Sequence, residues 1–224
     1  AGMASVTITN GLILHGTASV GHPTSPSPAC LWFAGSQTLD GEGTVVFGAE
    51  GRNGLLLRHG GTTLTLGPGI TVRGNRGILG GFPDVPWSGP TDVSVLNRGI
   101  VQADTIGGWI WLRGRPFVNR GRLRTPGGIL NLGELDNREG ELVATESTGP
   151  LQVNGGTVLG GVVRTDPGTP FAPSGHSVVL DGVTIAGDLD LTAGMASVTI
   201  TNGLTLNGTA SVGHPTSPSP ACLW

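Results

Sequence analysis

The sequence predicts an all-β chain wound into a parallel β-solenoid, and three observations support this. Short apolar runs such as "TTLTLG" and "SVVLDG" alternate with polar residues at period two, which is typical of half-buried strands. Glycine supplies 41 of the 224 residues and proline 16, and no stretch free of both is long enough for an ordinary helix. Short strands that recur at roughly regular intervals indicate stacked coils.

The start of the chain belongs to a long internal repeat. Residues 1–32 align without a gap on residues 193–224, and only two pairs differ: Ile13 against Thr205 and His15 against Asn207. We interpret residues 1–192 as one complete solenoid repeat unit and residues 193–224 as the start of the next, near-identical unit. The sequence is therefore expected to be a window onto a longer protein.

The two mismatches predict which face of the first strands is buried. Positions 13 and 15 are two apart, so they share one face of an extended strand, while Leu12 and Leu14 share the other. One face changes between the copies and the other keeps leucine. We expect the leucines to face a core and positions 13 and 15 to be exposed.

Two segments interrupt the strand rhythm and are predicted to leave the solenoid as loops. One is the proline-rich "GHPTSPSPACLW" at 21–32, repeated at 213–224, and the other covers 75–95. The repeated loop carries Cys30 and Cys222, which would lie about nine coils apart, too far for a disulfide with each other. We expect partly buried free thiols; a disulfide between neighbouring rods is the alternative.

The middle of the chain indicates the length of a coil. The patterns "LNRGIVQA", "VNRGRLRT" and "DNREGELVA" place Asn97, Asn119 and Asn137 at similar intervals along the chain. Coils of about 20 residues, stacked about 4.8 Å apart, give about nine or ten coils per unit and an advance of about 45 Å. We predict that the three asparagines form a ladder of amide hydrogen bonds at one corner; three unrelated turns are the alternative.

Trp109 and Trp111, in "WIWL", have two interpretations. They are expected to fill a wide part of the core, and the alternative is a sugar-stacking platform on an outer face.

We predict no catalytic, cofactor-binding or metal-binding residue. The histidines and cysteines lack metal-ligand spacing. The net charge of -3 and the scattered arginines exclude a nucleic-acid face, and no window approaches the apolar length of a membrane span. Closely spaced acidic pairs are interpreted as solvated surface, although such pairs serve acid–base chemistry in enzymes that act on carbohydrate. These pairs are Asp40 and Glu42, Glu134 and Asp136, Glu139 and Glu141, and Asp188 and Asp190.

Several phrases resemble the large β-strand-repeat proteins of bacterial surfaces and secretions, such as autotransporter passengers and filamentous-haemagglutinin-like adhesins. They are "FAGSQTLDGEGTVVFG", "TTLTLGPGITVRGNRG", the successive "NRG" coils and "VVLDGVTIAGDLDLTAGMASVTITNGLTLNGTASVG". The resemblance implies a right-handed β-helix, an extracellular or cell-surface location and a structural or adhesive role.

The expected function is therefore a structural component of an extracellular filament or stalk. Its expected partner is itself, through head-to-tail or covalent continuation and lateral association, because an uncovered terminal coil exposes a sheet edge. An adhesin that binds surface carbohydrate is the alternative, and a β-helical polysaccharide-active enzyme is the second alternative.

Overall fold

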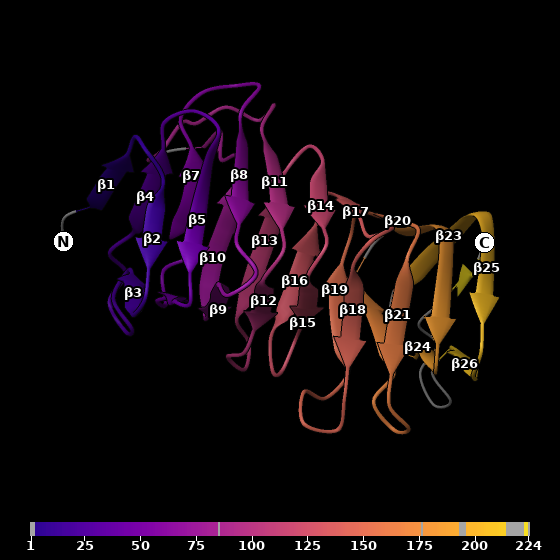
Figure 1. Ribbon diagram of the computed structural model, residues 1–224. Helices are drawn as coiled ribbons and strands as arrows, with labels where there is room; N and C mark the ends of the chain where they lie inside the picture. Colours follow the sequence, from indigo (N-terminus) through magenta and orange to yellow (C-terminus); the bar gives the residue numbers. More distant parts are fainter. Residues whose placement is uncertain (1–2, 85, 176, 193–195, 214–221, 224) are drawn as a thin grey trace.

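The alternating apolar runs form strands, and the strands wind into a right-handed parallel β-solenoid (Figure 1). This computed structural model describes residues 3–84, 86–175, 177–192, 196–213 and 222–223. In Figure 1 the chain advances from left to right while the near strands run downward and the far strands run upward, which defines the hand. Within the described residues every regular element is a strand. The predicted all-β solenoid is confirmed.

Each of the first seven coils supplies one strand to each of three parallel faces. The first face contains β1 (Ala4–Ile8), β4 (Ala29–Phe33), β7 (Gly54–Leu57), β10 (Arg76–Gly80), β13 (Trp109–Arg113), β16 (Ile129–Leu132), β19 (Leu151–Asn154), β22 (Phe171–Ser174), β24 (Leu189–Leu191) and β26 (Ala210–Val212). The second contains β2 (Leu12–Leu14), β5 (Gln37–Gly41), β8 (Thr63–Leu66), β11 (Ser94–Asn97), β14 (Phe117–Asn119), β17 (Glu134–Asp136) and β20 (Thr157–Leu159).

The third face contains β3 (Thr17–Val20), β6 (Thr44–Phe47), β9 (Thr71–Gly74), β12 (Ile100–Ala103), β15 (Arg122–Arg124), β18 (Glu141–Ala144) and β21 (Val162–Thr165). Near the C-terminal end, β23 (Val178–Ala186) and β25 (Ser197–Leu206) each run from the second face into the third. The short strand β27 (Cys222–Leu223) then pairs with the second-face part of β25.

Alternate residues of every face meet in one continuous core along the axis. Phe33, Phe47, Phe117 and Phe171 are its largest buried side chains. At the N-terminal end, Leu12 and Leu14 pack against this core while Ile13 is 71% exposed and His15 is exposed. The orientation predicted from the two repeat mismatches is confirmed.

The two copies of the internal repeat lie on different faces of the solenoid. Residues 4–8 form β1 on the first face of the first coil, whereas their copies at 196–200 enter β25, whose first half pairs on the second face of the ninth coil. The offset between the copies therefore spans eight coils and one further strand. This is fewer than the nine or ten coils expected, because most coils are longer than the expected length of about 20 residues. The coil from Ile78 to its paired position Trp111 is much longer than the coil that follows it, from Trp111 to Asn131.

The predicted loop at 75–95 is shorter than expected, because β10 keeps residues 76–80 in the coil. Of the following loop 81–93, the described residues 81–84 and 86–93 fold over the outer side of the first face, where Phe82 and Trp87 pack in a cluster with Cys30, Trp32 and Leu56. The indole Nε1 of Trp87 donates a hydrogen bond to the Arg52 carbonyl at 2.6 Å, which fixes the loop. A second, smaller hydrophobic cluster thus lies outside the main core.

The proline-rich loop is also shorter than expected. Residues 21–28 lie outside the strands, but β4 begins at Ala29, so Cys30 belongs to a strand and not to the loop. Parallel pairing of β4 with β1 and β7 sets this boundary. In the second copy, residues 214–221 and 224 lie outside the described residues.

Candidate functional site

Asn97, Asn119 and Asn137 lie above one another at the corner where the second face ends, and all three are fully buried. The Asn97 Nδ2 donates to the Asn119 Oδ1 at 2.8 Å, and the Asn119 Nδ2 donates to the Asn137 Oδ1 at 2.8 Å. Backbone amides join the column as well, since the Gly121 N–H donates to the Asn119 Oδ1 at 3.2 Å. The column joins three successive coils and has a structural role.

Cys30 lies on the outer side of β4 and is only 2% exposed. Burial raises the pKa of its thiol to about 12, and the nearby charge of Arg58 offsets this only in part. The reactive form of cysteine is the thiolate, so Cys30 offers neither the charge state nor the access that a disulfide between rods requires. Cys222 lies in β27, at the opposite end of the solenoid.

We expect thiol reagents to modify Cys30 far more slowly than an exposed cysteine. A pKa near 12 instead of 9.0 lowers the thiolate fraction at pH 8 about a thousandfold. The measurement is iodoacetamide labelling followed by mass spectrometry in a Cys222→Ser background. Trp87→Ala, which removes a side chain packed against the cluster that contains Cys30, should accelerate labelling, whereas a native rate close to that of free glutathione would contradict this placement.

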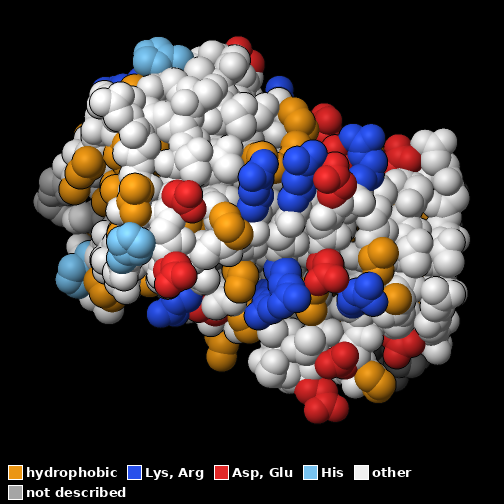
Figure 2. Space-filling model, viewed as in Figure 1, with side chains coloured by type: hydrophobic (Ala, Val, Ile, Leu, Met, Phe, Trp, Pro, Cys, Tyr) orange, Lys and Arg blue, Asp and Glu red, His pale blue; other side chains and the backbone are white. Residues whose placement is uncertain are grey.

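Charged side chains are interspersed on the second and third faces (Figure 2). Glu139 pairs with Arg120 at 3.0 Å, and Glu141 lies 3.4 Å from both Arg122 and Arg164. Other members of the acidic pairs accept hydrogen bonds from backbone amides; the Asp40 Oδ1 accepts from Gly41 and the Asp190 Oδ1 from Thr192.

In the described part of the chain, no group of three or more His, Cys, Asp or Glu could hold a metal ion. Those residues also contain no helix long and apolar enough to cross a membrane.

Trp109 and Trp111 point away from the core, so the expectation that they fill it is wrong. Ile110 and Leu112 take the inward positions of β13 and are 0% and 1% exposed. The two tryptophans stand half-buried on the outer side of the first face, with ring centroids 5.9 Å apart. In "WIWL" the positions on both sides of the strand are apolar, so the sequence pattern did not distinguish the inner side from the outer side.

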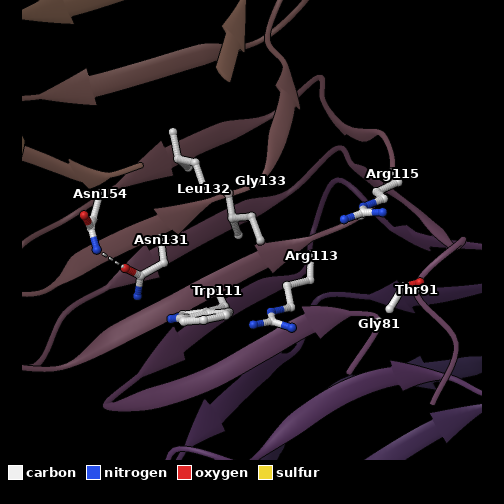
Figure 3. A pocket seen from close by; sticks show the side chains of 11 residues that line it. Gly81, Thr91, Trp111, Arg113, Arg115, Asn131, Leu132, Gly133 and Asn154 are labelled. Atoms are coloured by element: carbon white, nitrogen blue, oxygen red, sulfur yellow. Dashed lines mark hydrogen bonds between the residues drawn. The ribbon is translucent and has the colours of Figure 1, made fainter. Parts of the chain in front are cut away.

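A groove of about 420 Å³ opens beside Trp111, where the loop 81–93 ends (Figure 3). Trp111 is in register with Asn131 on the next strand and Asn131 with Asn154 on the strand after it. The Asn154 Nδ2 donates to the Asn131 Oδ1 at 2.8 Å. Figure 3 shows the Asn131 nitrogen directed toward the Trp111 ring. Two amides and one indole thus form a column along the outer surface.

Two arginines complete the groove. The Arg113 guanidinium carbon lies 3.8 Å from the Trp111 ring centroid and 5.6 Å from that of Phe82. The Arg113 guanidinium is partly buried, and this burial lowers its pKa. The charge of Asp84 opposes the shift, and the charge of Arg115 adds to it. Arg115 is exposed and points into the groove from the side opposite Asn131 (Figure 3). Among the described residues, neither guanidinium has an ion-pair partner within 4.0 Å.

No protein-family model, curated protein or solved structure matches this chain. Its functional assignment therefore depends on its own residues.

Proposed function

We propose that the chain is a structural rod unit of an extracellular or cell-surface filament or stalk, in which units follow one another end to end through the repeated segment. The supporting observation is that, within the described residues, the second copy has the preceding strand β23 beside β25, which the first copy lacks. The first copy has the following strand β6 beside β3, and no following strand pairs with the equivalent β26 in the described part of the second copy. The resemblance to bacterial β-strand-repeat adhesins and fibres supports the extracellular location.

The exposures of equivalent side chains make the point quantitative. Val6 is 58% exposed, whereas its copy Val198, which has the strand β23 beside it, is 0% exposed. The relation reverses at the other end of the segment, where Val20 is 2% exposed beneath β6 and its copy Val212 is 48% exposed. One context buries both ends of the segment: a coil like 171–191 before it and a coil like 29–47 after it.

The offset of eight coils and one strand sets the geometry of such a rod. Each unit would advance about 40 Å and turn by one face, about a third of a turn, relative to the unit before it. Three units would contain 25 whole coils, extend about 120 Å, and return the fourth unit to the orientation of the first.

A chain of three consecutive units, each equivalent to residues 1–192, tests the proposal. We expect cryo-electron microscopy to show one unbroken rod in which the loop 81–93 appears on a different face in each successive unit. Separate rods joined by flexible breaks would contradict the proposal, as would loops aligned on one face.

Adhesion through carbohydrate is a second candidate function, and one specific observation favours it. The groove beside Trp111 brings an indole, two amides and two arginines together on an outer surface, as sugar-binding sites often do.

A further inference from the structure

The outer side of the first face is a continuous column with two different halves. Ile78, which is in register with Trp111, is buried beneath the loop 81–93, and that loop ends at the groove. On the other side of Trp111 the column continues through Asn131, which is half-buried, and Asn154, which is exposed. A ligand lying along the solenoid axis would therefore have the loop at one end and open surface at the other.

The groove has a surplus of positive charge. Arg113 is held between the rings of Trp111 and Phe82, which fixes its position, and Arg115 faces the same space from the next turn. Guanidinium groups bind carboxylates through planar, paired hydrogen bonds. Partial removal of Arg113 from water strengthens its attraction to an anion, because the local dielectric constant is lower. The chemistry that fits this end of the groove is a carboxylate.

The other end of the groove is neutral and hydrogen-bonding. The Asn131–Asn154 hydrogen bond uses one oxygen and one nitrogen, leaving the Asn131 Nδ2 as a donor and the Asn154 Oδ1 as an acceptor within the described residues. A row of alternating donors and acceptors beside an indole complements hydroxyl groups on a ring with an apolar face. Sugars have this combination, whereas an acidic peptide would instead require backbone partners.

We propose that this groove binds an acidic oligosaccharide, with one uronic acid carboxylate held by Arg113 and Arg115 and the next sugar held by Asn131 and Asn154 against Trp111. The site gives the second candidate function a ligand class and lies within one unit, so it does not depend on end-to-end continuation of the rod. In a continuous rod of the proposed geometry, the site would recur on each of the three faces in turn.

Isothermal titration calorimetry with tetragalacturonic acid tests this site, with its methyl ester as the uncharged probe. We expect Arg115→Gln to weaken binding about tenfold or more, since a lost charge-assisted hydrogen bond has an effect of that size. Asn131→Ala, which leaves both arginines in place, should weaken binding several-fold. Arg98→Gln is the matched control, because it also removes an exposed charge, but from a corner outside the groove.

Three outcomes would overturn the proposal. The first is the absence of binding at millimolar tetragalacturonic acid, and the second is an equal loss in the Arg98 and Arg115 variants, which would indicate general charge attraction. The third is equally tight binding of hexaglutamate with the same dependence on Asn131, which would make the groove a peptide site. Binding that requires Arg115 and Asn131 and is lost with the methyl ester would support the acidic glycan.

Discussion

Replacing Asn119 by alanine is expected to lower the free energy of unfolding by about 4 kcal/mol. Asn119 is the middle member of the buried amide column. Its replacement removes both 2.8 Å hydrogen bonds between side-chain amides and the hydrogen bond from the Gly121 N–H. The Asn97 Nδ2 and Asn137 Oδ1 would lose these partners in a region closed to water. Each buried polar group left without a partner costs about 1 to 3 kcal/mol, and the cavity adds to this cost.

Urea unfolding followed by circular dichroism measures the effect. Asn131→Ala is the matched control, because it also breaks a 2.8 Å hydrogen bond between two side-chain amides, but one on the outer surface. We expect this variant to lose less than about 0.5 kcal/mol, since water replaces the lost partner. Equal losses in the two variants would show that burial does not set the value of the column.

The fold could be predicted because its determinants are local. A short strand bounded by glycine or asparagine is specified by a few neighbouring residues, and coils of similar length place such strands on a common axis. In the same way, the spacing of Asn97, Asn119 and Asn137 predicted that these residues stack at one corner. Identical residues at coil intervals make a polar column possible, because each amide can both donate and accept.

The face of the solenoid on which the second copy begins could not be predicted, because an offset in sequence counts residues and not strands. Coils in this chain differ in length, and the coil between the paired positions Phe171 and Leu189 is little more than half as long as the coil between Ile78 and Trp111. An average coil length therefore gives the number of coils only roughly. Whether one repeat period closes a whole number of coils depends on every individual loop.

The groove escaped prediction for a different physical reason. In β13 both faces are apolar, and the outer face becomes a packing surface only because the loop 81–93 folds across the strands before it. Nothing local to "WIWL" reports where that loop ends. Arg115 and Asn154 reach the same groove from strands and turns far apart in the sequence, so only the coil register brings them together.

Placing residues 171–192 directly before Ala1 is expected to stabilise the first coil strongly. Residue 192 precedes the second copy in the same way, so the added residues have the sequence needed to meet the first copy in register. In the second copy, Leu180 is paired with Ile200 and Val183 with Leu204. The added coil should therefore cover Ile8 and Leu12, and Val6 should fall from 58% exposed toward the 0% of Val198.

Burying these side chains should raise the free energy of unfolding of the first coil by about 3 kcal/mol or more. Hydrogen–deuterium exchange checks this directly, because an increase of about 1.4 kcal/mol in opening free energy slows exchange about tenfold. The control is the same extension with the added Leu180 and Val183 both replaced by aspartate, which keeps the length but places charge against the core. If the protection of residues 4–14 rises equally with both extensions, the proposed packing of consecutive units through the repeated segment would be contradicted. If only the apolar extension protects this segment, the one-face offset between the copies is compatible with continuous stacking, because the same residues then pack equally well on either face of the coil.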